Sequence, residues 1–154
     1  MAQHNTLFDY DPDAQPRDER TIKVCHVDEP YDFYGGRASY GRCLGEADPT
    51  SSGWLGNPFK LADHSREEAI EKFEEAFINE LSESRAFCNA VLGLEGNRVA
   101  CHCRHSKETE PACHLDVVRE ALLDGRVYLI AQKRHQIALT DAQLDRMARP
   151  EDLL

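Results

Sequence analysis

The sequence predicts an α/β fold, a small Rossmann-like layered arrangement in which a mainly parallel sheet is flanked by helices. Three observations lead to this class. A β-branched segment, TIKVCHV, covers residues 21–27, a helical pattern covers residues 65–81, and a second apolar segment, RVACHC, covers residues 98–103. Strands that alternate with helices are typical of parallel sheets with crossover connections. We therefore expect the two strands to be parallel neighbours, with the helix packed against them.

The helix over residues 65–81 follows from a capping motif and a one-sided apolar pattern. Ser65 opens a capping box, in which a hydroxyl oxygen accepts a free N–H of the first helical turn. Phe73, Phe77 and Leu81 recur at helical spacing, while glutamates occupy the opposite face. Similar patterns predict further helices over residues 84–92, 113–123 and 140–148, and a third strand over residues 127–131.

The length and the N-terminal composition indicate one domain after a polar arm. A chain of 154 residues is most simply a single domain. Residues 1–20 are acidic and poor in large apolar side chains, which predicts a flexible arm before a domain over residues 21–154. No apolar run is long enough for a transmembrane helix, and the N-terminus is too polar for a signal peptide. We therefore expect a cytoplasmic protein with no membrane partner, whose six cysteines are reduced rather than paired in a disulfide framework.

The charge balance restricts the possible partners. The chain has 28 Asp and Glu against 18 Lys and Arg, a formal net charge of -10. Such a surface repels phosphate backbones, so we expect no binding to duplex nucleic acid. The basic residues comprise five Lys and thirteen Arg. An acidic chain with little Lys resembles the proteins of halophilic archaea and their viruses, and ordinary acidic solubility gives the same composition.

Two segments that are rich in chemically active residues follow the two predicted strands. Residues 31–59 contain six glycines and several aromatic residues, without a helical pattern. A long loop of this kind in a compact domain is usually functional. Residues 101–114 contain three of the six cysteines and three of the seven histidines. Because ligands of parallel sheets sit beyond the carboxyl ends of the strands, we expect both segments to meet in one site.

Four motifs resemble one family in content and in order. They are YDFYGGR at residues 31–37, GNPF at residues 56–59, REEAI at residues 66–70, and the pair Cys101-His102-Cys103 and Cys113-His114. Together they resemble the domain of unknown function 4326 family over about residues 22–124. His102 replaces an aromatic residue of the family pattern, and Leu115 replaces a glycine. The cysteine–histidine motif also resembles that of the domain of unknown function 488 family. The resemblance implies a fold and the position of a site, without a particular reaction.

The first interpretation of the site is a pocket for a phosphorylated, nucleotide-like ligand. Cys101 or Cys113 would serve as nucleophile and His114 as acid or base, since a thiol at a helix N-terminus ionises more easily. A guanidinium would meet the phosphate, an amide would bind the ligand by a hydrogen bond, and aromatic rings would stack on a base or sugar. The predicted ligand-binding residues are Tyr34, Arg37, Trp54, Asn57 and Cys103.

The second interpretation is a zinc site, which the sequence leaves open. Three thiolates and one imidazole form a chemically proper set. The adjacent residues Cys113 and His114 rarely bind the same ion, so the better fourth ligand along the chain is His105. The alternative zinc ligands are therefore Cys101, Cys103, His105 and Cys113.

A third interpretation is structural, because a free cysteine is often a small buried apolar residue. Cys25 and Cys88 fit this interpretation best, and Cys101 fits it as well as it fits a functional role. The sequence thus predicts a protein that binds or processes a phosphorylated small ligand. The alternative is a zinc-binding or non-enzymatic accessory module, and the sequence decides neither the reaction nor the oligomeric state.

Overall fold

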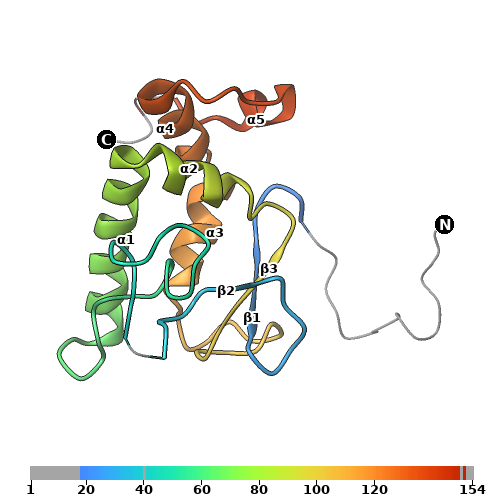
Figure 1. The fold of residues 1–154 in the computed structure, drawn as a ribbon. Coiled ribbons are helices and arrows are strands. Elements are labelled where there is room, and N and C mark those ends of the chain that lie inside the picture. Colours follow the sequence, from blue (N-terminus) through green and yellow to red (C-terminus); the bar gives the residue numbers. More distant parts are fainter. Residues whose placement is uncertain (1–17, 40, 150, 152–154) are drawn as a thin grey trace, which may run out of the picture.

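The computed structural model describes residues 18–39, 41–149 and 151, so the predicted N-terminal arm lies almost entirely outside the described residues. Within them, three short strands form one parallel sheet beside five helices (Figure 1). The strands are β1 (Lys23–His26), β2 (Phe33–Tyr34) and β3 (Arg98–Cys101), in the order β1-β3-β2. The chain therefore has a mixed α/β fold with a parallel sheet, as the sequence predicts.

The central strand β3 brings the ends of all three strands to one edge. In the parallel β1–β3 pair Val24 lies opposite Val99, so the predicted parallel pairing is confirmed. β2, which the sequence pattern did not indicate, pairs in parallel with the other side of β3, with Tyr34 opposite Ala100. The pairing continues beyond β2, because the N–H of Gly35 donates to the carbonyl of Ala100 at 2.7 Å.

Helices α1 (Arg66–Glu83) and α2 (Arg85–Leu92) form where the capping residues predict them. The Ser65 hydroxyl accepts the N–H of Glu68 at 3.1 Å, which starts α1. Ser84 ends α1 and caps α2 with its own hydroxyl, so the two helices meet at a single residue. The buried residues of α1 are Ala69, Phe73, Phe77 and Leu81.

The predicted strand over residues 127–131 is wrong, because these residues lie in a helix. α3 (Leu115–Leu123) is followed after two residues by α4 (Arg126–His135), and Gly125 between them has a φ of 84°. Every residue from Val127 to Ala131 is buried, because α4 packs against α1, α2, α3 and α5 (Asp141–Arg146). The first part of α4 is covered on all sides, so it shows an apolar run without a helical period, which resembles a buried strand, whereas Lys133 and Arg134 near its end are exposed.

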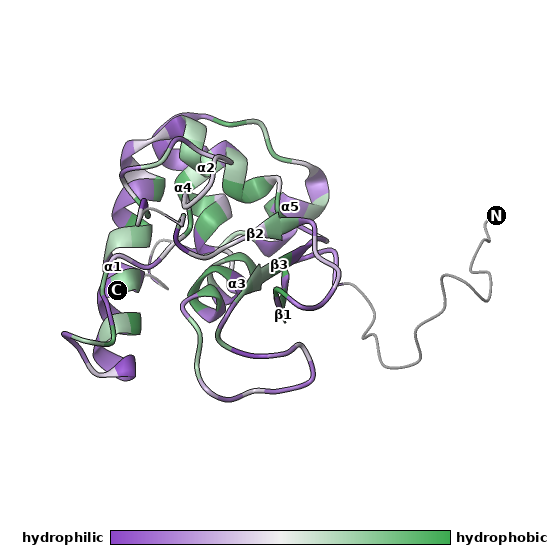
Figure 2. Cartoon of the chain, turned by 60° about the horizontal axis from the view of Figure 1, so that its bottom comes forward, coloured by the Kyte–Doolittle hydropathy of each residue, from purple (hydrophilic) through white to green (hydrophobic). Residues whose placement is uncertain are grey.

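The helices gather on one side of the small sheet (Figure 1). α3 is the helix that contacts β1, whereas α1 packs mainly against α2, α3 and α4, so the expected packing of α1 directly on the strands is replaced by packing through α3. Figure 2 shows that α1 and α2 carry hydrophobic and hydrophilic residues on different sides. Among the described helices, none is long and apolar enough to cross a lipid bilayer.

The glycine-rich loop between β2 and α1 is anchored by residues of its own. Trp54 and Leu55 are buried, and the Trp54 ring meets the Phe87 ring of α2 edge to face at 5.6 Å between centroids. The N–H of Leu44 donates to the carbonyl of Gly56 at 2.9 Å, which closes the loop on itself. Trp54 is therefore a core residue, against the prediction that it stacks on a ligand.

Candidate functional site

A cavity of about 690 Å³ opens at the carboxyl edge of the sheet. Each strand contributes residues that follow it: Val27 after β1, Gly36 after β2 and His102 after β3. The first turn of α1, with Arg66 and Ala69, closes another side. The volume lies within the range of small-molecule sites, which is about 300–1,000 Å³. The two loops therefore meet where the strand directions predict.

The cavity contains most of the candidate residues that the sequence singles out. Cys113 has no exposed surface and does not line the cavity, so its burial opposes the predicted role as a nucleophile that ligands can reach. Trp54 is also absent from the lining. The candidate residues that line the cavity are Tyr34, Arg37, Asn57, Cys101, Cys103 and His114.

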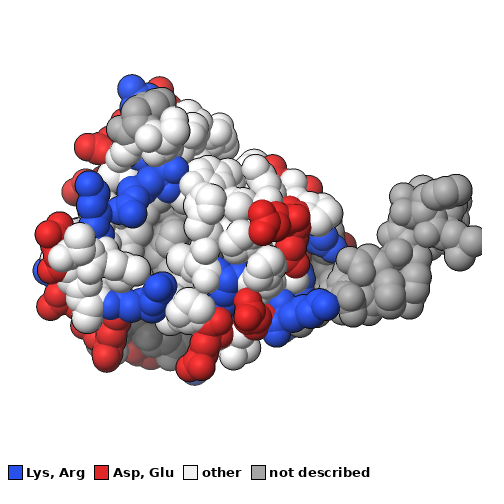
Figure 3. Space-filling view, turned by 90° about the horizontal axis from the view of Figure 1, so that it is seen from below, with Lys and Arg blue, Asp and Glu red and all other residues white. Residues whose placement is uncertain are grey.

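The charge of the cavity is opposite to that of the whole chain. Arg37 and Arg66 line it, and none of the described lining residues is Asp or Glu. Arg37 donates through Nη1 to the carbonyl of Asn57 at 3.1 Å, and Arg66 donates through Nη1 to the carbonyl of Ala112 at 3.0 Å. Both acceptors are neutral, so the two guanidinium groups keep their charge and further N–H donors for an anion. Figure 3 views this edge and shows Lys and Arg side chains on both sides of a hollow.

Two polar side chains in the cavity hold the loops that form it. The Tyr34 hydroxyl donates to the carbonyl of Arg37 at 3.0 Å. The Asn57 Oδ1 accepts the N–H of Phe59 at 2.9 Å, and its Nδ2 donates to the carbonyl of Ala69 at 3.2 Å. Asn57 therefore fixes the GNPF turn against α1, and the second N–H and the second lone pair of Oδ1 are left for the predicted ligand contact.

The mouth of the cavity is partly apolar. Tyr31 and Leu61 both line it, with 45% and 54% of their surface exposed. Exposed side chains of this size are otherwise rare among the described residues, where Leu144 is the third. Phe59 and Ile70 extend the apolar wall inward. A ligand that fills the cavity would thus meet cationic groups on one part of its surface and apolar groups on another.

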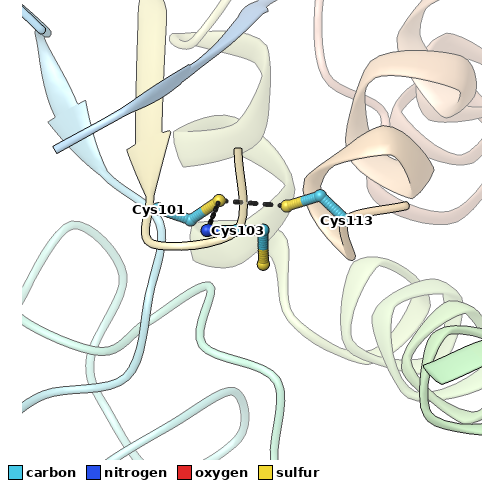
Figure 4. A group of neighbouring side chains, drawn as sticks. All are labelled: Cys101, Cys103 and Cys113. Carbon is cyan, nitrogen blue, oxygen red and sulfur yellow. Dashed lines mark hydrogen bonds between the residues drawn. The ribbon is translucent and has the colours of Figure 1, made fainter. Parts of the chain in front are cut away.

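Three cysteines meet at the floor of the cavity: Cys101 and Cys103 line it, and Cys113 is buried beside them. The Sγ atoms of Cys101, Cys103 and Cys113 lie within 4.8 Å of one another, and those of Cys101 and Cys113 are 3.1 Å apart. Figure 4 shows the Cys101 and Cys113 side chains pointing toward each other, with Cys103 beside them. All three thiols are free. The strand end thus supplies two sulfur atoms, and the segment before α3 supplies the third.

The contacts among the three thiols shift their pKa values in opposite directions. Hydrogen bonds from the Cys101 and Cys113 thiols, with the nearby His114, hold the pKa of Cys103 well below its usual range. The hydrogen bond to Cys103 raises the pKa of Cys101 to about 11. The pKa of Cys113 is also raised, by its bonds to Cys101 and Cys103 and by burial. These contacts therefore favour the thiolate form at Cys103, a half-buried residue that lines the cavity.

The imidazole of His114 is oriented by a backbone carbonyl. Its Nε2 lies 2.8 Å from the carbonyl oxygen of Gly35, and its Nδ1 lies 3.9 Å from the Sγ of Cys113. Because a carbonyl can only accept, Nε2 carries the proton of the neutral ring and Nδ1 carries a lone pair. The Phe73 ring meets the imidazole edge to face at 4.9 Å, which fixes its plane.

His105, the predicted fourth zinc ligand, belongs to a different group. Its ring stacks on that of His26 with centroids 4.4 Å apart, and its Nδ1 lies 3.8 Å from Glu29. His26, Asp28 and His105 form a cluster of their own, and the cysteine cluster does not include His105. The prediction that His105 completes the zinc site is therefore wrong. Glu29 accepts the N–H of Ser106 at 2.9 Å, and this bond holds the loop after Cys103, with His105, away from the cysteines.

Sequence reasoning missed two features of the site. Arg66 enters the cavity because it is the first residue of α1, a position that the Ser65 cap could have indicated. Arg104 and Asp116 form a bidentate ion pair in which the guanidinium is nearly buried, and Arg104 also donates to the carbonyl of Pro111 at 3.1 Å. No sequence pattern indicates this pair, because its partners meet only when the loop folds back on α3.

The remaining cysteines lie outside the cavity, and their pKa values are raised. Burial raises the pKa of Cys25 and of Cys88 to about 11. Burial and a hydrogen bond to Glu46 raise the pKa of Cys43 to about 11. Their positions agree with the structural interpretation of Cys25 and Cys88.

The comparison with known proteins agrees with the motifs. No curated protein and no solved structure matches the chain. A model of one family, Domain of unknown function (DUF4326), matches residues 19–124, which is more than half of the chain and includes the sheet, the cavity loops and the cysteine cluster. The chain therefore belongs to the DUF4326 family.

Proposed function

We propose that the protein binds a small phosphorylated, nucleotide-like ligand in the cavity at the carboxyl edge of its sheet, in the manner of Rossmann-like folds. One observation carries this proposal. The chain has 28 acidic and 18 basic residues, yet the described cavity lining contains two arginines and no carboxylate. In an acidic protein such a reversal of charge is expected where an anion binds, because acidic side chains in the lining would repel it.

The two parts of the cavity suit the two parts of such a ligand. Arg37 and Arg66 offer planar groups of N–H donors, which match the oxygen atoms of a phosphate. Tyr31 and Leu61 at the mouth offer an aromatic and an aliphatic surface for a base or sugar. Cys103 and the imidazole of His114 lie at the floor, where they contact the ligand or take part in its processing.

Calorimetry and thermal shift with matched probes test the proposal. The probes are a nucleoside monophosphate, the same nucleoside without phosphate, and inorganic phosphate. We expect the monophosphate to bind best and to raise the melting temperature. Replacing Arg37 or Arg66 by Gln removes a charged donor, which costs about 1.5–3 kcal/mol, so the affinity should fall by about tenfold or more.

Arg134 provides the matched control. Its side chain also donates to a backbone carbonyl, that of Ser82 at 3.4 Å, but it does not line the cavity. Arg134→Gln should leave the affinity for the monophosphate unchanged. Equal affinity for the nucleoside and the monophosphate, or equal effects of Arg37→Gln and Arg134→Gln, would contradict the proposal.

A non-enzymatic module stabilised by zinc is the second candidate. The closeness of the three Sγ atoms favours it, since thiolates are preferred ligands of zinc. Metal analysis of the purified protein tests this candidate separately from ligand binding. Stoichiometric zinc without any affinity for phosphorylated probes would favour the module over the ligand-binding protein.

A further inference from the structure

The cysteine cluster has nearly the dimensions of a tetrahedral metal site. Zinc–sulfur bonds of about 2.3 Å place the sulfur atoms of a tetrahedral site about 3.8 Å apart. The Sγ atoms of Cys101, Cys103 and Cys113 all lie within 4.8 Å of one another. The closest pair, Cys101 and Cys113 at 3.1 Å, would separate by about 0.7 Å to reach the tetrahedral distance.

The orientation of His114 leaves Nδ1 as the ligand atom of the neutral ring. Its Nε2–H donates to the carbonyl of Gly35 at 2.8 Å, so the lone pair is on Nδ1. Nδ1 lies 3.9 Å from the Sγ of Cys113, which is close to the distance between two ligand atoms of one tetrahedron. His114 lies outside the group of three sulfur atoms that are within 4.8 Å of one another, so its ring must move toward the other two sulfur atoms when the ion binds. Histidine ligands of metals almost always donate their other N–H to a carbonyl or carboxylate, as His114 does. Adjacent residues such as Cys113 and His114 rarely bind the same ion. Ligation through Nδ1, the ring nitrogen nearer to the backbone, allows both residues to reach it.

The surroundings of the sulfur atoms also fit metal-bound thiolates. The N–H of Cys103 donates to the Sγ of Cys101, and the N–H of Leu115 donates to the Sγ of Cys113, both at 3.4 Å. Such bonds orient the ligands and stabilise their charge. The N–H of Cys113 is bound by Asp116 at 3.0 Å, which fixes the backbone from which both Cys113 and His114 project.

The other group of possible ligands among the described residues fits a metal less well. It consists of His26, Asp28 and His105. The rings of His26 and His105 are stacked with an interplanar angle of 16°. The lone pairs of imidazole nitrogens lie in the ring plane, so those of stacked rings run side by side and do not converge on one ion. Nδ1 of His26 also accepts the N–H of Asp28 at 3.1 Å.

We propose that Cys101, Cys103, Cys113 and His114 bind one zinc ion at the floor of the cavity. The ion joins the end of β3 to the start of α3, two elements that are otherwise connected by the loop over residues 102–114. Four protein ligands close the coordination sphere, as in structural zinc sites, so no position is left for water or substrate. The zinc candidate for the same cavity is thereby specified. Binding of an anion by Arg37 and Arg66 is compatible with it, whereas zinc-bound Cys103 and His114 take no part in processing the ligand.

Metal content and cobalt spectra of the full chain test the site. We expect about one zinc ion per chain in the wild type, and a cobalt-substituted protein with the visible bands of a tetrahedral site and thiolate charge-transfer bands. Cys103→Ala and His114→Ala should lose most of the metal affinity. Cys88→Ala, which removes a buried thiol elsewhere, and His105→Ala, which removes the ligand predicted from the sequence, should retain the metal.

A rescue variant keeps the test decisive if the alanine variants fail to fold. A cysteine thiolate reaches about as far from its backbone as a histidine Nδ1, so His114→Cys should bind cobalt and shift its spectrum toward that of a four-thiolate site. A wild-type chain that binds no metal from a zinc-buffered solution would overturn the proposal. So would loss of the metal in His105→Ala with full retention in His114→Ala. Arg37→Gln should lose affinity for the phosphorylated probes but retain zinc. Loss of ligand binding and loss of the metal can therefore be distinguished.

Discussion

Gly35 shows how one missing side chain positions the site. A Cβ atom at this residue would lie 2.7 and 2.8 Å from the two methyl carbons of Leu115 and 2.9 Å from a methyl carbon of Val99. Without that atom, the end of β2 lies against β3 and against the first residue of α3. The Gly35 carbonyl consequently reaches the imidazole of His114.

We predict that Gly35→Ala destabilises the protein and disturbs His114. The added methyl group must displace Leu115 or the backbone, and overpacking of this kind typically costs about 1–3 kcal/mol. Urea unfolding monitored by circular dichroism measures the change in the free energy of unfolding. The imidazole resonances of His114 should shift as well, because its carbonyl acceptor moves.

Gly93 is the control for this substitution. It ends α2 at a φ of -68°, and a Cβ there would meet a backbone oxygen of Ala90 at 3.3 Å, which a small adjustment relieves. Gly93→Ala should change stability by less than about 1 kcal/mol, in either direction, since the loss of chain freedom offsets the contact. Equal losses of unfolding free energy in the two variants would show that the close packing around Gly35 does not cause the destabilisation.

The sequence predicts well which residues reach the site. It predicts less well which other residues they contact. Arg37 and Cys103 follow strands, and strand direction alone brings them to the carboxyl edge. The environment of Trp54 and the partner of His105 depend on how two irregular loops fold. Trp54 turns inward to Phe87, and His105 is drawn to Glu29, through contacts that no local pattern specifies.

At the level of elements, the sequence predicts α1 correctly but not α4 or β2, because it shows only local patterns. α1 is half exposed, so its apolar residues recur at helical spacing and its Ser65 cap is visible in the sequence. α4 packs against four other helices, and residues 127–131 are all buried and apolar. The sequence therefore shows no helical periodicity there. β2 has two residues, too few for an alternating pattern, and it forms only because β3 offers a free edge.

The ion pair between Arg104 and Asp116 joins two elements of the site. Arg104 follows Cys103 in the loop after β3, and Asp116 lies in the first turn of α3. Their exposed fractions are 8% and 26%. Asp116 also accepts the N–H of Cys113 at 3.0 Å, so the pair aligns the two segments that carry the cysteines.

We predict that Arg104→Ala destabilises the protein strongly. The substitution leaves the Asp116 carboxylate partly buried without its cation, and breaking one partner of a buried pair costs about 3–5 kcal/mol. Because Asp116 retains some exposure, we expect the lower end of this range, about 3 kcal/mol. Chemical denaturation measures the loss, and the thiol of Cys103 should react faster with a maleimide as the loop loosens.

Arg20 offers an exposed pair for comparison. It binds Asp18 at 2.8 Å, but their exposed fractions are 58% and 39%. Arg20→Ala should therefore destabilise the protein far less than Arg104→Ala and leave the thiol reactivity unchanged. A loss of similar size in both variants would show that burial does not set the strength of the Arg104 pair.

At the scale of the whole molecule, one buried phenol connects segments that are distant in sequence. The Tyr128 hydroxyl of α4 donates to the carboxylate of Glu95 before β3, and Arg146 of α5 donates to the Tyr128 oxygen at 3.2 Å. Gln143 of α5 donates to the same carboxylate at 2.7 Å. These bonds fasten the C-terminal helix to the core without help from an apolar face, since α5 has no buried residue among those described.

This network predicts how stability depends on alkaline pH. Burial, with the hydrogen bond to Glu95, raises the pKa of Tyr128 from its ordinary value of 10 to about 12. A raised pKa in the folded protein means that the phenol stabilises the fold fully below pH 10, and that this stabilisation is lost as the pH rises toward about 12. Tyr128→Phe lacks the ionisable group, and below pH 10 it should cost about 1–2 kcal/mol, because the Glu95 bond is lost.

The quantity to measure is the difference in unfolding free energy between wild type and Tyr128→Phe across this pH window. Other groups titrate there too, such as Cys25 and Cys88 with pKa values of about 11, but they contribute equally to both proteins and cancel in the difference. The advantage of the wild type should shrink steadily between pH 10 and pH 12, while the absorbance of tyrosinate grows. A difference that stays constant over the whole window would show that Tyr128 does not hold its proton through burial and Glu95, and that α5 is fastened by other contacts.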